Sequence, residues 1–205
     1  GIRQYVEYLN KSKEVLYPSV IYCEGTVNDV YVEVAMQHND GYNEGCYSFV
    51  NNITTPEGGT HLAGFKNALT KTFNDYARSQ KYLKENEQNL SGEDIREGLT
   101  AIISVKLGEP QFEGQTKGKL GNTEITSIVS AMVYEKLMTY FEENPSVAKA
   151  IFTKALDASR AREAARKARD LARRKGVLES NSLPGKLADC TEKSADSTEI
   201  YIVEG

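Results

Sequence analysis

The sequence predicts an α+β fold with a four-stranded sheet, packed helices and a long basic helix towards the C-terminal end. Segments rich in β-branched and aromatic residues cluster before residue 53, and residues of these types favour strands. Apolar residues recur at helical spacing after residues 60 and 122. The stretch from Ser146 to Lys175 lacks glycine and proline and is rich in alanine, the residue with the highest helix propensity.

The first predicted elements are a short helix and three strands. Residues 2–9 place their apolar side chains on one side of a helix. The predicted strands cover residues 20–24, 27–37 and 46–52. An Asp-Gly pair within residues 38–43 is a turn signal, so we expect an antiparallel hairpin between the second and third strands.

A turn and a long amphipathic helix follow. Residues 54–61 combine proline with paired glycines, which is typical of a turn, and Thr60 is a candidate helix cap. Apolar residues from Leu62 onwards recur at intervals of three and four, which predicts a helix to about residue 80. His61 could serve as a ligand, although a single histidine is more often a cap or a residue at the edge of the core.

The next elements are a short helix and a buried strand. Ser91 followed by Asp94 fits a capping box, which predicts a helix through Arg96. Residues 99–107 are almost continuously apolar, as expected for a central strand with both faces buried.

A glycine-rich loop with two lysines comes next, between residues 113 and 122. Glycine permits positive φ angles, so the backbone can turn tightly while Gln115 and Lys117 project from the tip. A lysine ammonium acts as a point charge for phosphate, and a glutamine amide adds a hydrogen-bond donor. The alternative is a solvated connection, because the loop lacks the residue order of a P-loop.

Two helices are predicted after this loop. Asn122 is a candidate cap for the first, which carries a broad apolar stripe as far as Phe141. Asn144 and Pro145 mark the start of the second, because proline is favoured at the first helical position. Small apolar residues form one face of the second helix, and we expect a neighbouring helix to approach that face closely.

The last helix also carries an arginine stripe with members spaced four, three and four residues apart, namely Arg162, Arg166, Arg169 and Arg173. Residues 159–175 hold eight basic and two acidic side chains, although the whole chain has a net charge of −4. The stripe is about 16 Å long by the rise of an α-helix, which is enough to follow several phosphates of a nucleic acid. The alternative is a solvated helix face.

The end of the chain is predicted to belong to a connection and a further domain. Gly176 is expected to end the helix, residues 176–198 are polar, and residues 199–205 begin with a strand whose partners are missing. Because the chain starts with Gly1, we interpret it as an internal fragment of a longer protein.

Composition excludes several classes of protein. The apolar runs are far shorter than the roughly 18 residues that span a bilayer, and no signal segment opens the chain, so we expect a cytoplasmic protein. The cysteines are three in number and widely spaced, without a C-x-x-C pair. A disulfide framework or a cysteine-based metal site is therefore not predicted.

Several motifs, in order along nearly the whole chain, resemble the ATPase component of the bacterial type IIA topoisomerases and most closely the DNA gyrase B family. They are Thr-Pro-Glu-Gly-Gly-Thr-His at 55–61, Gly-Glu-Asp-Ile-Arg-Glu-Gly at 92–98, Gln-Thr-Lys at 115–117, the basic helix at 161–169, Leu-Pro-Gly-Lys-Leu-Ala-Asp-Cys at 183–190 and Val-Glu-Gly at 203–205.

The resemblance implies a domain organisation. Residues 1–175 would form the transducer domain, a left-handed βαβ module of a kind also found in ribosomal proteins. Residues 176–198 would be a connecting segment. Residues 199–205 would form the first strand of a truncated TOPRIM domain.

The resemblance also implies roles for individual residues. Lys117 would contact the γ-phosphate of ATP bound in the preceding domain, with Gln115 beside it. Glu204 would bind Mg²⁺ and take part in DNA cleavage and religation. The arginine stripe would line the cavity through which the transported DNA duplex passes.

The implied function is that of an ATP-dependent DNA topoisomerase, which couples ATP hydrolysis to strand passage and supercoiling. Its implied partners are double-stranded DNA, the DNA gyrase A protein and a second copy of the same polypeptide, which assemble as an A2B2 heterotetramer. No membrane partner is implied. The fragment alone is expected to be inactive. The alternatives are the ATPase component of topoisomerase IV, a nucleic-acid-binding module that uses the basic helix without nucleotide, and a structural dimerisation arm.

Overall fold

The computed structural model describes residues 1–180, with side chains described for residues 1–173. The chain divides into two compact units, Gly1–Ala161 and Arg162–Gly205. The first unit holds the sheet and the helices packed on it. The described part of the second unit is helical.

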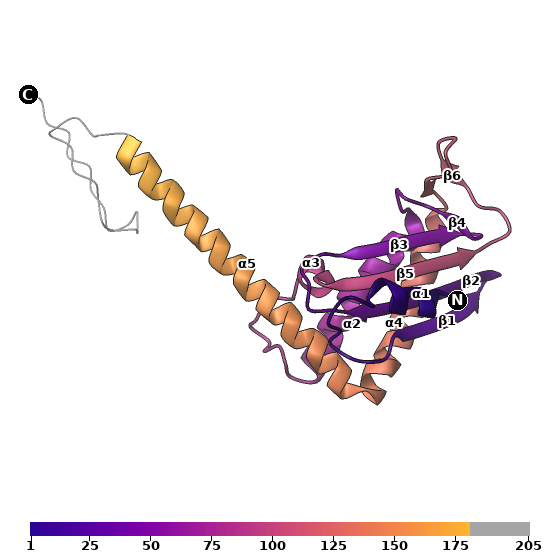
Figure 1. Ribbon diagram of the computed structural model, residues 1–205, viewed down its shortest axis with the longest axis horizontal. Helices are drawn as coiled ribbons and strands as arrows, with labels where there is room; N and C mark the ends of the chain where they lie inside the picture. The colour runs from indigo at the N-terminus through magenta and orange to yellow at the C-terminus, as the bar shows by residue number, and fades with distance from the viewer. Residues whose placement is uncertain (181–205) are drawn as a thin grey trace, which may run out of the picture. The chain divides into compact units, whose positions relative to one another are not determined.

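A five-stranded mixed sheet forms the centre of the first unit (Figure 1). The strand order is β1-β2-β5-β3-β4, in which only the β3–β5 pair is parallel. The prediction of four strands was wrong, because Asn51 and Asn52 adopt positive φ angles and return the chain beside β3. The bounds are β1 Ile21–Val27, β2 Val30–His38, β3 Gly45–Val50, β4 Ile53–Thr54 and β5 Leu99–Lys106.

The predicted hairpin at residues 38–43 was also wrong. Strand β5 lies between β2 and β3, so these two strands do not pair with each other. The hairpin instead joins β1 to β2, where Asn28 and Asp29 both have positive φ angles, 48° and 60°. Two such residues form the tight turn that matches the twist of paired strands, which is why the predicted strand over 27–37 is interrupted at its start.

The prediction that residues 99–107 form a buried central strand is confirmed, with an end at Lys106. All residues of β5 except Lys106 are buried. The strand pairs antiparallel with β2 and parallel with β3, so β3, the helices after it and β5 form a βαβ unit.

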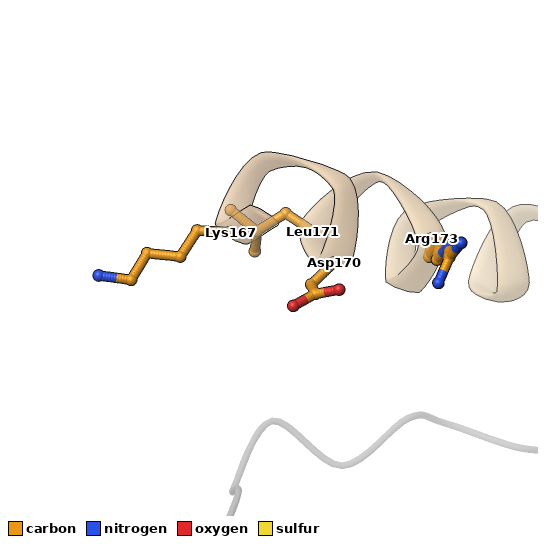
Figure 2. Close-up of a pocket in the computed structure, with 4 residues that line it drawn as sticks. All are labelled: Lys167, Asp170, Leu171 and Arg173. Carbon is orange, nitrogen blue, oxygen red and sulfur yellow. The ribbon is translucent and has the colours of Figure 1, made fainter. Parts of the chain in front are cut away.

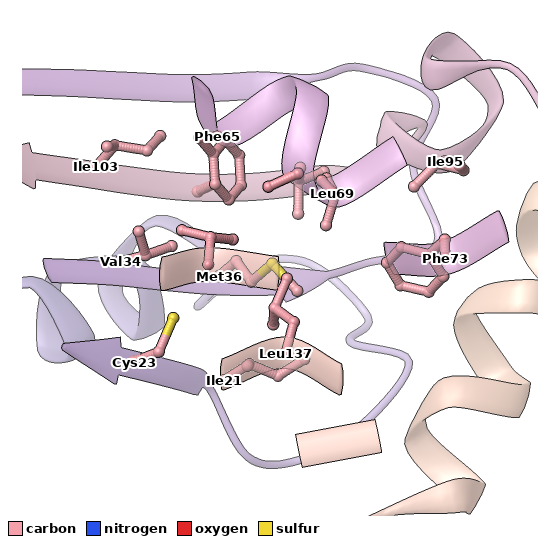
Figure 3. Packing of buried hydrophobic residues seen from close by; sticks show 14 of the residues in the cluster. Ile21, Cys23, Val34, Met36, Phe65, Leu69, Phe73, Ile95, Ile103 and Leu137 are labelled. Carbon is pink, nitrogen blue, oxygen red and sulfur yellow. The ribbon is translucent and has the colours of Figure 1, made fainter. Parts of the chain in front are cut away.

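Helices cover both faces of the sheet. On one face, Phe65 and Leu69 of α2 and Leu137 of α4 pack against residues of β2 and β5 that include Met36 and Ile103 (Figure 3). On the other face, Val6 of α1 packs against Ala35 and Ile102, the strand neighbours whose side chains alternate with the first set. The bounds are α1 Ile2–Leu9, α2 Thr60–Ser79, α3 Gly92–Arg96, α4 Thr123–Glu143 and α5 Pro145–Ser180.

Four helix predictions are confirmed at their cores. The helix over residues 2–9 ends at Asn10, as expected. Ser91 accepts a hydrogen bond from the Asp94 N–H (3.2 Å) and caps α3. Helices α2 and α4 bury the predicted apolar stripes, and they approach so closely at Gly64 that a Cβ there would lie 2.6 Å from the Thr126 carbonyl oxygen.

Helix α5 differs from the prediction in two ways. It continues through Gly176 to Ser180, because a single glycine costs about 1 kcal/mol relative to alanine and does not by itself end a helix. The small-residue face is buried at Ala155 and Ala158, but residues 161–173 are exposed on all sides. None of the described helices is long and apolar enough to span a membrane.

Candidate functional site

The lysine loop projects from a small two-stranded hairpin. Strands β6 (Phe112–Glu113) and β7 (Lys119–Leu120) pair antiparallel and leave residues 114–118 as the connecting loop. Gly114 has a φ of 78°, and a Cβ at this position would meet no atom within 4 Å. Gln115 and Lys117 are both exposed, so the structure confirms that their side chains lie at the surface.

Lys117 has an unusual backbone conformation. Its φ of 53° lies in the left-handed region, which residues other than glycine, asparagine and aspartate seldom adopt. Such strain is often found at functional sites, where the surrounding structure holds the residue in place. Periodicity and composition carried no signal of this conformation.

The two lysines of the hairpin have different environments. The Lys119 ammonium lies 2.7 Å from a Glu113 carboxylate oxygen across the hairpin, and this hydrogen bond raises the pKa of Lys119. Within the described part of the chain, Lys117 makes no ion pair. The loop therefore presents one cation that is available to an anion from outside.

Backbone hydrogen bonds attach the C-terminal side of the loop to residues 57–59. The Glu57 N–H donates to the Gly118 carbonyl (3.0 Å), and the Leu120 N–H donates to the Gly58 carbonyl (3.1 Å). Gly59 forms a parallel bridge with Leu120 at the start of α2. Gly59, and not the predicted Thr60, is the residue at the helix cap position, because only glycine fits there.

Gly59 is required by its geometry. Its φ of 133° is unfavourable for any residue with a side chain, and a Cβ would lie 2.4 Å from the Leu120 nitrogen. The hairpin and the start of α2 are in contact through their backbones, so the space between them cannot accommodate a methyl group.

His61 is fully buried behind this contact. Its Nε2 lies 3.1 Å from the Thr55 hydroxyl, which lies 2.7 Å from the Ser48 hydroxyl. The Ser48 hydroxyl donates to the Thr55 carbonyl (3.0 Å), so the Thr55 hydroxyl must donate to Ser48 and accept from the His61 Nε2–H. Burial lowers the pKa of His61 to about 4, and the ring is neutral at pH 7.

Asn122 is the N-cap residue of α4, as predicted, although its side chain has another role. Its side chain makes no capping hydrogen bond to α4. The Asn122 Oδ1 instead accepts from the Gln111 N–H (2.6 Å), and its Nδ2 donates to the Glu109 carbonyl (3.3 Å) and the Glu124 carboxylate (3.0 Å). The residue therefore holds the chain on the N-terminal side of the hairpin.

The arginine stripe is exposed at every position, namely Arg162, Arg166, Arg169 and Arg173. Other charged residues of α5 are interspersed with it, and Lys167 pairs with Glu163 at 2.9 Å. Figure 2 shows Lys167, Asp170, Leu171 and Arg173 projecting from this helix, and they are the described residues that line an open pocket there. The stripe is therefore an exposed basic surface on α5.

The predicted metal ligand Glu204 lies outside the described residues, as do the motifs at 183–190 and 203–205. Among residues that the structure describes, no group of three or more histidine, cysteine, aspartate and glutamate side chains could hold a metal ion. The prediction of an Mg²⁺ ligand at Glu204 therefore stays a prediction.

Comparisons with known proteins identify relatives over most of the chain. A family model described as DNA gyrase B matches residues 1–171. The DNA gyrase B protein of Clostridium acetobutylicum is 64% identical over 206 residues, which cover 100% of this chain and 32% of that protein. The DNA gyrase B protein of Halalkalibacterium halodurans is 56% identical with the same coverage. The chain thus spans about a third of the length of these curated relatives.

Solved structures give the same result. The 43K ATPase domain of Thermus thermophilus gyrase B, in complex with an aminocoumarin, matches with a TM-score of 0.77 and 44% identity, over 83% of this chain and 46% of that one. The topoisomerase IV ATP-binding domain of Francisella tularensis matches with a TM-score of 0.67 and 27% identity, over 78% and 43%. The family model and the full-length coverage by close relatives show that the chain belongs to the DNA gyrase B family.

Proposed function

We propose that this chain is the transducer part of an ATP-dependent type IIA DNA topoisomerase, in which Lys117 senses the γ-phosphate of ATP held by a neighbouring domain. The observation that carries the proposal is the environment of Lys117. Its ammonium is exposed and makes no ion pair in the described part of the chain, its φ angle is positive, and its loop is attached by backbone hydrogen bonds to residues 57–59. Gln115, two residues away and equally exposed, adds an amide donor for the same phosphate.

A γ-phosphate contact gives the loop a reason to move. A ligand shifts a conformational equilibrium only through different affinities for the two states. The γ-phosphate is present in ATP and absent from ADP, so Lys117 gains an anionic partner in one state and loses it in the other. Hydrolysis of ATP thereby changes the position of the loop. The position of the loop in turn is coupled to strand passage and supercoiling.

The remaining roles follow from the family. The arginine stripe contacts double-stranded DNA, because exposed guanidinium groups along a helix neutralise phosphates without reading sequence. Glu204 supplies an Mg²⁺ ligand for DNA cleavage. Mg²⁺ and the ATP pocket both require neighbouring domains, so the fragment alone neither hydrolyses ATP nor cuts DNA.

The proposed architecture is that of the family. Residues 1–175 form the transducer with a left-handed βαβ crossover, residues 176–198 connect it, and residues 199–205 begin a TOPRIM domain. The working assembly is an A2B2 heterotetramer with the DNA gyrase A protein in the cytoplasm.

Two other functions are distinguished by measurement. The first is the ATPase component of topoisomerase IV, which would decatenate DNA. It is less favoured than the gyrase function, because the matching topoisomerase IV structure has 27% identity and the gyrase B structure has 44%. A module that binds nucleic acid through the basic helix alone predicts that Lys117 has no effect on nucleotide turnover.

The test is Lys117→Ala in the full-length protein, assembled with the gyrase A protein. We expect ATP turnover to fall by about a hundredfold, since a charge positioned at the transferred phosphoryl group typically contributes about 10²–10³ in rate. Lys149→Ala is the matched control, because this lysine is exposed on α5 away from the hairpin. Unchanged turnover in a folded Lys117→Ala protein would overturn the proposed function.

A further inference from the structure

We propose that residues 55–61, which we call the glycine clamp, position the Lys117 loop and transmit its displacement to the sheet and to α4. This inference rests on the proposed function of Lys117, because the clamp would act on the nucleotide only through that side chain. Its members are therefore positioning residues, and the inference names a mechanical link that the exposed loop needs in order to affect the rest of the fold.

The first step is the attachment of the loop to the clamp. The C-terminal side of the loop is bonded to the clamp at Gly118 and again at Leu120, two residues apart. At the other side of the loop, the space around Gly114 is open. Asn122 holds the N-terminal side of the hairpin through Gln111 and Glu109, and the clamp holds its C-terminal side, so a displacement of Lys117 reaches the clamp through β7.

The second step is that the clamp and β7 pack closely against each other at Gly59. At Gly59 the hydrogen atom that replaces a side chain faces the Leu120 backbone, and a methyl carbon would lie 2.4 Å from its nitrogen and 2.5 Å from its oxygen. The atoms that such a methyl carbon would meet belong to the backbone of β7, which cannot move aside as the end of a flexible side chain can. A displacement of β7 therefore moves the start of α2 with it.

The third step is the connection from the clamp to two further elements. Thr55 is bonded to Ser48 of β3 through its backbone N–H (2.9 Å), and the buried Ser48–Thr55–His61 chain runs from the sheet to α2. The Thr126 hydroxyl of α4 donates to the Thr60 carbonyl (3.2 Å). The clamp thus contacts β7, β3 and α4, and it connects the hairpin to both layers of the fold.

The experiment compares Gly59→Ala with Lys117→Ala in the full-length protein. The readout is the ratio of affinities for a non-hydrolysable ATP analogue and for ADP, which isolates the γ-phosphate contact. We expect Gly59→Ala to lower this ratio about tenfold or more, since misplacement of a catalytic contact by about 1 Å can cost up to a hundredfold. The double variant should lose no more than Lys117→Ala alone, because both changes remove the same contact.

Gly108→Ala is the matched control, because a Cβ at Gly108 meets nothing within 4 Å although the residue leads into the same hairpin. If Gly59→Ala does not fold, Thr55→Val is the second variant, since it keeps the volume and removes the hydroxyl that joins Ser48 to His61. An unchanged ratio in the folded clamp variant, with a reduced ratio in Lys117→Ala, overturns this inference alone. An unchanged ratio in Lys117→Ala overturns the proposed function as well.

Discussion

The Lys117 loop and the arginine stripe of α5 are both exposed and basic, but they are supported in different ways. The loop is held by a hairpin, by backbone bonds to residues 57–59 and by a buried histidine behind them. The described side chains at 161–173 are exposed all round, so tertiary packing does not constrain the stripe within the part of the chain that is described. A cation held in place by backbone bonds can report on one phosphate at one place, whereas a row of exposed cations along a helix produces a field that many phosphates share.

The largest expected effect is a loss of folding stability in acid, which arises at buried histidines of the unit that supports the loop and not at the arginine stripe. His38 and His61 are both buried, and burial lowers the pKa of each to about 4. The His38 Nε2–H donates to the Ile95 carbonyl (2.9 Å), so its Nδ1 accepts from the Tyr17 hydroxyl (3.0 Å). Arginine does not titrate in this range.

A histidine whose folded pKa is below its unfolded value stabilises the protein above the unfolded pKa, and this stability is lost as the pH falls from about 6.5 to about 4. Between pH 7.5 and 5 we expect each histidine to reduce the free energy of unfolding by about 2 kcal/mol. Urea unfolding of the chain over this range measures the loss, and His38→Gln and His61→Gln should each reduce the pH dependence. The same pH dependence in all three proteins would contradict this prediction.

Lys117→Arg tests whether position matters as much as charge in the loop. Arginine keeps the positive charge but replaces a compact ammonium with a planar guanidinium. If the supported loop holds the ammonium at one phosphate, ATP turnover in the full-length protein should fall about tenfold to a hundredfold, which corresponds to about 1.4–2.8 kcal/mol. Turnover equal to wild type would show that the loop supplies charge without a defined position.

Replacement of all four arginines tests whether the stripe acts through its total charge and not through one defined contact. With Arg162, Arg166, Arg169 and Arg173 all changed to glutamine, DNA binding should lose salt dependence, with a slope smaller by up to about 3–4, because each neutralised phosphate contributes about 0.9. Fluorescence anisotropy of a short duplex at several salt concentrations measures the slope. Strand passage by the full-length assembly should be impaired, whereas a purely structural arm predicts no change in either measurement.

A single arginine should have the smallest effect. Arg169→Gln is expected to reduce the salt slope by about 1 and to change the free energy of unfolding by less than about 0.5 kcal/mol, as for most surface substitutions. The comparison with Lys117→Arg is direct, since both are single changes at exposed cations. A loss of DNA binding as large as that of the fourfold variant would indicate that Arg169 occupies a defined site.

Part of the fold was predictable because its signals are local. The spacing of Phe65, Leu69 and Phe73 indicated α2, and the apolar run at 99–107 indicated a central strand, because burial and periodicity are written into neighbouring residues. The Asn28-Asp29 and Asn51-Asn52 pairs were missed, although asparagine and aspartate tolerate positive φ angles and are hairpin signals in their own right.

The exposed residues of the candidate site could be predicted from the sequence, but the contacts that hold their loop in place could not. Gln115 and Lys117 stood out through glycine-rich surroundings and the family resemblance, and their exposure is confirmed. The contact between Gly59 and Leu120 joins residues that are about sixty positions apart, and no local pattern indicates it. His61 was considered as a ligand or a cap, whereas in the structure it is a buried neutral member of a hydrogen-bond chain.

The sequence by itself determined the helices, the buried central strand, the two basic segments and the family, because each depends on residue types at short spacing. Only the tertiary structure decided that β5 separates β2 from β3, that a fifth strand forms, and that the lysine loop is attached through a glycine to α2. The physical reason is that strand pairing and close backbone approach are interactions between distant segments, whose energies depend on how the whole chain packs.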